Sequence, residues 1–69
     1  MTKSALEKSL TASAGGALVT IQDIMDWSGR SRDYLKKNIL TDLESIQDGQ
    51  SRFYFAGDVA QAIADKAKK

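Results

Sequence analysis

The chain has 69 residues, enough for one small domain, and its ten Lys and Arg nearly balance nine Asp and Glu, which leaves a formal net charge of +1. Because Cys and His are both missing, disulfides, thiolate metal sites and the commonest general base are excluded, and we expect no enzymatic activity, no metal and no cofactor. No apolar run approaches the roughly 20 residues that span a bilayer, and no secretory signal follows Lys3, so we expect a cytoplasmic protein with no membrane partner and no small-molecule substrate.

Residues 1–16 are small and polar, and they predict a flexible N-terminal arm or, as the alternative, a short helix. Ser4 would cap such a helix, with Glu7 three residues later as in a capping box. Leu6 and Leu10 would give it only a thin apolar stripe. Because so little surface could be buried, the sequence favours the disordered arm over a packed helix.

The first helix of the folded domain is predicted to begin at Thr20, a good N-cap residue, with Asp23 placed to complete a capping box. Val19 either begins a short strand or simply precedes this cap. Trp27 is expected in the core. The helix is predicted to end after about two turns, with Gly29 in a left-handed C-terminal position.

A second helix is predicted over residues 31–40, with Ser31 as its N-cap. Leu35 lies on its packed side, and Tyr34 is expected to pack in the core as well, although its hydroxyl could reach a phosphate. The 3.6-residue period leaves the following side chains toward solvent, where they form a polar face with two or three positive charges. These side chains are Arg32, Asp33, Lys36 and Lys37.

A β-hairpin is predicted over residues 43–55, with its turn at residues 48–49, because the Asp-Gly pair there suits a turn with positive φ. On its second strand, Phe53 and Phe55 share one face and Tyr54 takes the other. We expect Phe53 and Phe55 to fill the core, since a core this small needs their area.

A last helix is predicted after the hairpin, with Asp58 as its N-cap ahead of Val59 and Ile63. The chain then ends in a basic tail, residues 66–69, whose lysines suit a helix C-terminus.

Two short helices, a hairpin and a closing helix predict a fold that is mainly α with a small β-hairpin, a winged helix-turn-helix, over residues 17–65. In such a domain the helix at residues 31–40 would enter the major groove, and the hairpin at residues 43–55 would act as the wing. Arg is suited to guanine and Asp33 to cytosine, while Ser and Lys suit phosphate. The candidate DNA-binding residues are Arg30, Ser31, Arg32, Asp33, Lys36, Lys37, Gln50, Ser51 and Arg52.

Simpler interpretations remain open for each of these features. The charged helix face is also typical of a solvated surface, although the hairpin downstream favours the DNA interpretation, and the hairpin tip is equally typical of an ordinary polar turn. The pair Asp23 and Asp26, and the pair Asp42 and Glu44, lack the six or more oxygens that Ca²⁺ needs, so cap and surface roles account for them.

Residues 19–63 resemble the small winged-helix domains of phage and transposon excisionases, the DNA-binding heads of MerR-type regulators and some phage terminase small subunits. The resemblance implies a recognition helix in the major groove and a wing on the DNA backbone. The wing departs from the pattern of many relatives because it carries Asp42, Glu44 and Asp48. The matching positions are Thr20, Gly29, Ser31, Gly49, Phe53, Phe55 and Asp58.

We therefore expect sequence-specific binding of double-stranded DNA by a small excisionase-like or transcription-regulatory protein. The five cations Arg30, Arg32, Lys36, Lys37 and Arg52 would give a log–log salt slope of about −4 to −5. So small a footprint implies self-association or a larger protein partner. The alternatives are a protein–protein interaction module, whose hairpin edge would pair with a partner strand, and a phage packaging or virion component that assembles in rings.

Overall fold

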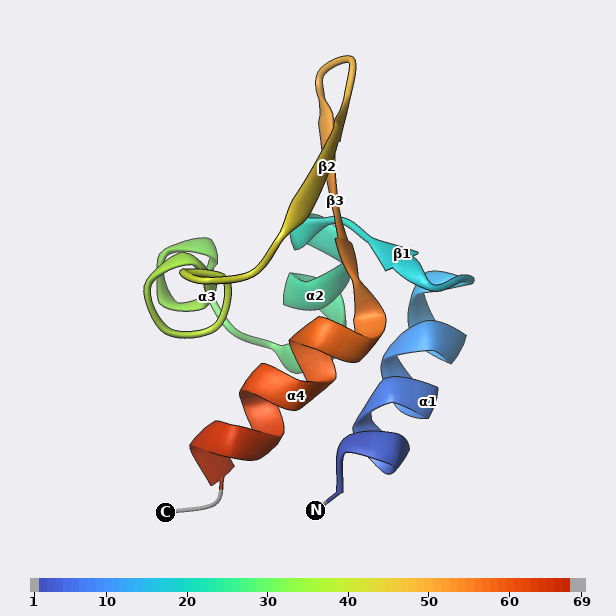
Figure 1. Cartoon of the computed structure of the whole chain (residues 1–69), viewed down its shortest axis with the longest axis vertical. Helices are drawn as coiled ribbons and strands as arrows, with labels where there is room; N and C mark the ends of the chain where they lie inside the picture. The colour runs from blue at the N-terminus through green and yellow to red at the C-terminus, as the bar shows by residue number, and fades with distance from the viewer. Residues whose placement is uncertain (1, 68–69) are drawn as a thin grey trace.

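The protein is a mainly helical domain with a small antiparallel sheet, as the computed structural model shows for residues 2–67 (Figure 1). Its sheet has three strands in the order β1-β3-β2. In chain order the elements are α1 (Lys3–Ala14), β1 (Leu18–Val19), α2 (Ile21–Ser28), α3 (Arg32–Asn38), β2 (Ser45–Asp48), β3 (Ser51–Phe55) and α4 (Ala56–Ala67).

Helix α1 corrects the expectation of a flexible N-terminal arm. It runs beside α4 (Figure 1), and Leu10 on its inner face is fully buried in the core. The two helices approach closely at Gly57, where a Cβ would stand 3.3 Å from a carboxylate oxygen of Glu7. The thin apolar stripe of α1 is therefore enough to hold this helix in the folded domain, because α4 covers it. Thr2, rather than Ser4, is the N-cap, and its hydroxyl accepts a hydrogen bond from the amide of Ala5 at 3.2 Å.

Local capping signals set α2 as predicted. The hydroxyl of Thr20 accepts from the amide of Asp23 at 3.2 Å, and the Asp23 carboxylate accepts in return from the Thr20 amide at 3.0 Å. This reciprocal pair is a capping box. The helix ends at Gly29, whose φ of +73° is the left-handed conformation expected there.

Helix α3 begins as predicted, with the Ser31 hydroxyl accepting from the amide of Tyr34 at 3.2 Å. It ends at Asn38, two residues earlier than the predicted helix, because Ile39 and Leu40 turn inward and are buried. The Thr41 hydroxyl then donates to the carbonyl oxygens of the last helical turn.

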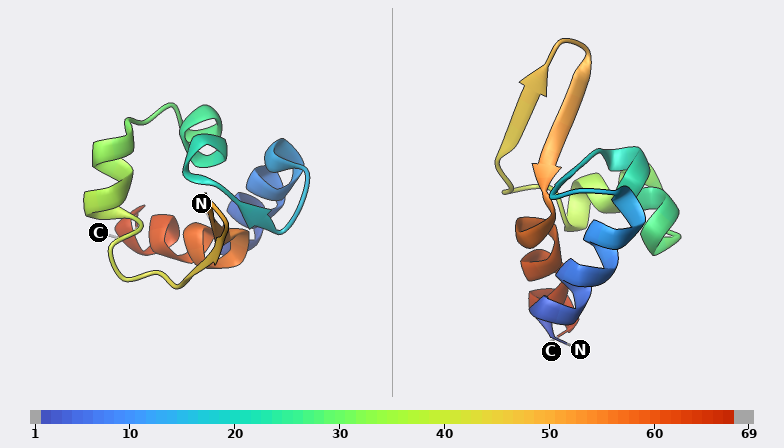
Figure 2. Two further views of the ribbon diagram at one scale, coloured as in Figure 1. Left: turned by 90° about the horizontal axis from the view of Figure 1, so that it is seen from above. Right: turned by 90° about the vertical axis from the view of Figure 1, so that its right-hand side faces the viewer.

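Strand β1 ties the N-terminal half of the chain to the hairpin. Leu18 pairs with Phe55, and Val19, which is fully buried, pairs with Tyr54. Val19 is thus a strand residue, one of the two predicted alternatives. The β2–β3 hairpin turns with φ of +64° at Gly49. It projects well beyond the helices, as Figure 1 and the right-hand view of Figure 2 show.

The face of β3 that enters the core is the opposite of the predicted one. Tyr54 is buried with 8% of its surface exposed, whereas Phe55 is 41% exposed and Phe53 is half-buried. The cause is the pairing with β1. Because Tyr54 sits across from Val19, both side chains point into the helical core, and the neighbouring positions of β3 must point outward.

Helix α4 follows β3 with no intervening loop, which corrects the prediction that Asp58 is its N-cap. The helix begins at Ala56, so Asp58 lies in its first turn. The amide of Ala56 donates to the carbonyl of Ala17 at 2.8 Å, and this contact replaces a side-chain cap. Lys66 of the predicted basic tail belongs to the last turn of α4, and residues 68 and 69 lie outside the described residues.

The core lies where the three helices α1, α2 and α4 meet α3 and the base of the sheet. Its largest fully buried side chains are Leu10, Ile24, Leu35, Val19 and Val59. None of the helices described over residues 2–67 has the length and apolar character to span a membrane.

Candidate nucleic-acid interface

The orientation of α3 places its charged residues on one flank and on its outer side, and uncharged polar residues on the other flank. Leu35 is 1% exposed and marks the inner side of the helix. At about 100° per residue, Arg32 and Lys36 lie on one flank, and Tyr34 and Asn38 lie on the other. Asp33 and Lys37 are one helical turn apart at the outermost position, facing away from the core.

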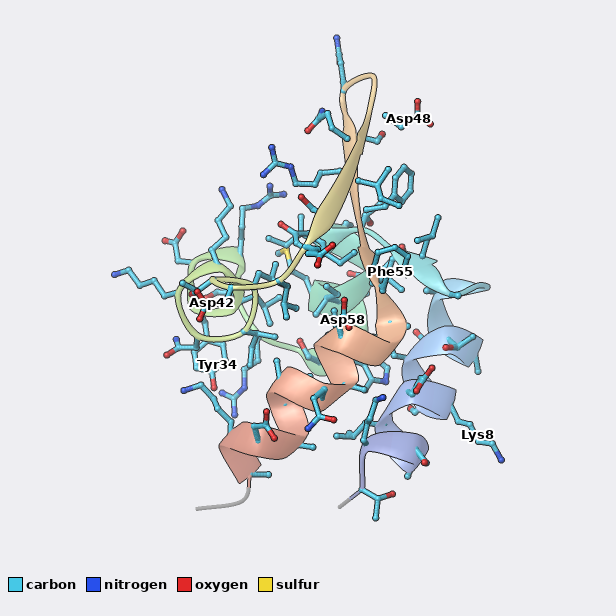
Figure 3. The ribbon with its side chains drawn as sticks, viewed as in Figure 1. Lys8, Tyr34, Asp42, Asp48, Phe55 and Asp58 are labelled. Atoms are coloured by element: carbon cyan, nitrogen blue, oxygen red, sulfur yellow. The ribbon has the colours of Figure 1, made fainter. Side chains whose placement is uncertain are left out.

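The Tyr34 flank faces the C-terminal half of α4. Arg30 belongs to this side, because its guanidinium carbon lies 5.4 Å from the centre of the Tyr34 ring. Both residues line a groove that they share with Lys66 of α4. Figure 3 accordingly draws Tyr34 below α3, on the side away from the hairpin. Arg30 is therefore separated from Arg32, although the two are neighbours in the predicted site.

The hairpin also has two distinct faces. Gln47 and Arg52 pair with each other across the strands, and strand alternation places them on the same face as Tyr54. The Nε of Arg52 donates to Oε1 of Gln47 at 3.2 Å. Asp48 and Ser51 form the next pair toward the tip and lie on the other face.

Figure 3 shows which of these two faces looks toward α3. Asp48 projects from the side of the hairpin away from α3, so the face that carries Gln47 and Arg52 is turned toward α3. The acid at the tip therefore does not stand between Arg52 and the helix. Among the predicted residues, the structure brings Arg32, Lys36 and Arg52 to one side of the molecule.

The remaining predicted residues are placed differently. Ser31 and Asp33 are exposed at the first turn of α3, but the Ser31 hydroxyl is engaged in its cap. Gln50 is exposed in the turn at the hairpin tip, and Ser51 begins the strand on the face away from α3.

Three acidic side chains gather elsewhere, between the segment after α3 and helix α4. Asp42, Asp58 and Asp65 line a second hollow of about 500 Å³ there. This acidic surface is distinct from the side that carries Arg32, Lys36 and Arg52. Within residues 2–67, no group of three or more Asp and Glu side chains is placed to hold a metal ion.

Sequence reasoning missed two features of the surface. Gln47 joins Arg52 on the hairpin, and this pairing was missed because the turn lies at residues 49–50, one residue later than predicted, which shifts the cross-strand register. Leu18 and Ile46 join Phe55 as exposed apolar side chains on the outer face of the sheet, with exposed fractions of 44%, 41% and 41%. No local signal marks that face, because it depends on which side of β3 enters the core.

Comparison with known proteins gives no information about the function, so the function has to be inferred from the geometry of the site. No protein-family model matches the chain, and neither a curated protein nor a solved structure matches it significantly.

Proposed function

We propose that this domain is a winged helix-turn-helix that binds double-stranded DNA, with α3 in the major groove and the β2–β3 hairpin as the wing. The observation that carries the proposal is the common orientation of Arg32 and Lys36 on α3 and Arg52 on the hairpin. A recognition helix and a wing must meet one duplex at the same time, so cations on both elements have to face the same way.

The dimensions of the two elements support this use. Helix α3 has seven residues, which makes it about 10 Å long at 1.5 Å per residue. An α-helix with its side chains is about 10–12 Å in diameter, which fits a major groove about 12 Å wide. The hairpin projects beyond the body, where it would reach the flanking phosphates or the minor groove (Figure 2).

Each side chain has a role suited to its position. Arg32, in the first turn of α3, is placed for a base edge, and the guanidinium fork matches guanine O6 and N7. Lys36 and Lys37, one turn later, would contact phosphates. Arg52 is already oriented by Gln47 and would contact the backbone beside the groove.

Four cations contribute to this interface, not the five counted from the sequence, because Arg30 faces α4. With about 0.9 of a counterion released per phosphate contact, the expected log–log salt slope is about −3 to −4.

The test is a salt titration of binding to a random-sequence duplex, followed by fluorescence anisotropy. Lys36→Gln and Arg52→Gln should each make the slope shallower by about 0.9. Lys8→Gln is the matched control, because Lys8 is exposed on α1, on the opposite side of the molecule from α3 (Figure 3). A salt-independent affinity, or an equal effect of Lys8→Gln, would rule this interface out.

A second candidate function is favoured by the outer face of the sheet. Leu18, Ile46 and Phe55 leave an apolar surface in contact with solvent, and such surfaces are typical of protein–protein contacts. The edge of β2 is also unpaired along Ser45–Asp48, and a partner strand could extend the sheet there. Sedimentation analysis over a range of concentrations tests self-association, which Phe55→Ser should abolish if this face is the contact.

A further inference from the structure

A groove lies on the flank of α3 opposite the proposed DNA interface. It has a volume of about 460 Å³ and is open on one side. Side chains from α1, α2, α3 and α4 line it, so the groove exists only in the folded domain. Its volume falls in the range of small-molecule sites, roughly 300–1,000 Å³.

The floor of the groove is apolar. Leu6 of α1, Leu35 and Ile39 at α3, and Ile63 of α4 all contribute to it. Trp27 adds its ring, and its indole N–H is already satisfied because Nε1 donates to Oγ of Ser9 at 2.9 Å. Because the indole N–H already has a hydrogen-bond partner, an apolar ligand would cover the Trp27 ring without leaving a polar group unpaired.

The charged groups at the groove are both positive. Arg30 lies over the ring of Tyr34, and Lys66 comes from the last turn of α4. Among the described residues no acidic side chain lines this groove, in contrast to the adjoining hollow, which shares Ile39 and Lys66 with it and is lined by Asp42, Asp58 and Asp65. An occupant with one anionic group would complement this charge, whereas a cation would be repelled.

We propose that the groove binds a small amphipathic carboxylate. The apolar chain or ring of the ligand lies on the floor beside Trp27, and its carboxylate is held by Arg30 and Lys66. A fork-shaped guanidinium fixed over an aromatic ring suits a carboxylate, because the planar group is oriented before the ligand arrives. The proposal does not depend on DNA binding, since Arg32, Lys36 and Arg52 lie on the other flank.

Trp27 supplies the readout, because it is the only tryptophan in the chain and lines the groove. The experiment titrates the full chain with decanoate, kept below the concentration at which it forms micelles, and follows tryptophan fluorescence. The expected result is a saturable change, with decanol, the neutral analogue, binding about fivefold more weakly and acetate giving no response. No saturable change, or equal affinities for decanoate and decanol, would overturn the proposal.

Two charge variants locate the carboxylate. Lys66→Gln and Arg30→Gln should each weaken decanoate binding about fivefold while leaving the affinity for decanol unchanged. Lys8→Gln is the control, because it removes the same charge from an exposed site outside the groove. Lys66 and Arg30 are both exposed, so both variants should fold. Loss of decanoate affinity in Lys8→Gln equal to that in Lys66→Gln would show general charge attraction and contradict the site.

Discussion

At the scale of single residues, local chemistry sets most of the turns and helix starts. Gly29 and Gly49 have φ of +73° and +64°, a region that L-residues with a side chain rarely adopt. Both positions were predicted, because each glycine ends a helix pattern or follows Asp in a turn. Thr20 and Ser31 were also predicted as caps, because each hydroxyl accepts from an amide only three residues away.

Predictions at this scale failed where a distant segment supplies the partner. The sequence alone predicts Asp58 as the N-cap. The carbonyl of Ala17 accepts a hydrogen bond from the amide of Ala56, however, and α4 therefore begins earlier. The predicted position of the α1 cap, Ser4, was wrong by two residues, because the Thr2 hydroxyl makes the same kind of hydrogen bond at the start of α1. The early start of α4 cannot be inferred from residues within one turn, whereas the Thr2 cap is as local as the Ser4 cap that was predicted.

The backbone requirement at Gly29 gives the first stability prediction. Gly29→Ala should destabilise the fold by about 1–2 kcal/mol, the cost of placing a Cβ in the left-handed region. Gly16→Ala is the matched control, because Gly16 has no such φ and nothing lies within 4 Å of the new Cβ. Its effect should stay within about 0.5 kcal/mol. Urea denaturation measures both, and similar losses in the two variants would mean that Gly29 carries no special strain.

At the scale of the elements, the pattern of β3 shows what alternation can and cannot establish. Alternating apolar residues predict a strand and divide its side chains between two faces, but three consecutive aromatics leave the buried face undecided. The choice is made by β1, which supplies only two residues, too few for a periodic signal. Val19 opposite Tyr54 places the tyrosine in the core, and Phe55 is left on the outer face.

This assignment predicts unequal costs for two aromatic truncations. Tyr54→Ala removes a buried ring and should cost about 3–5 kcal/mol, near the typical limit for large-to-small core changes. Phe55→Ala removes a ring that is 41% exposed, and the loss should be about 1 kcal/mol or less. Thermal unfolding followed by circular dichroism makes the comparison. If Phe55→Ala destabilised the protein more than Tyr54→Ala, the buried face of β3 would be the one predicted from the sequence.

Helix α3 shows the same limit for the candidate site. Its start, its Ser31 cap and its solvent-facing charges were predicted, because they depend on the cap residue and on the 3.6-residue period. The period alone treats Arg30, Arg32 and Lys36 as one positive surface. The structure separates them because Arg30 and Tyr34 lie on the flank of α3 that faces α4, where they line a groove, whereas Arg32 and Lys36 lie on the other flank. That separation yields two surfaces with different ligand chemistry.

At the scale of the whole molecule, charge placement matters more than net charge. A chain with a formal charge of +1 has no bulk attraction for DNA. It nevertheless gathers Arg32, Lys36 and Arg52 on one side, while acids line the hollow between α4 and the segment after α3. If the domain binds DNA as proposed, a field of this kind would orient it on the duplex, so the affinity should depend on salt far more steeply than the net charge suggests.

The folded unit includes α1, and Leu10 on this helix provides the whole-molecule prediction. This side chain is fully buried in the core with Val19 and Val59, so α1 is part of the same cooperative unit. Leu10→Ala should cost about 2–5 kcal/mol. That is a large share of the total for a chain this size, since roughly 0.05–0.15 kcal/mol per residue is typical.

Leu6→Ala is the matched control on the same helix, because Leu6 is only half-buried and should lose less. Chemical denaturation should show one transition in the wild type and in both variants, shifted furthest by Leu10→Ala. If the N-terminal segment were a loose arm, Leu10→Ala would leave the midpoint unchanged. A packed α1 also forms one wall of the groove through Leu6, so the same helix that completes the core completes the proposed ligand site.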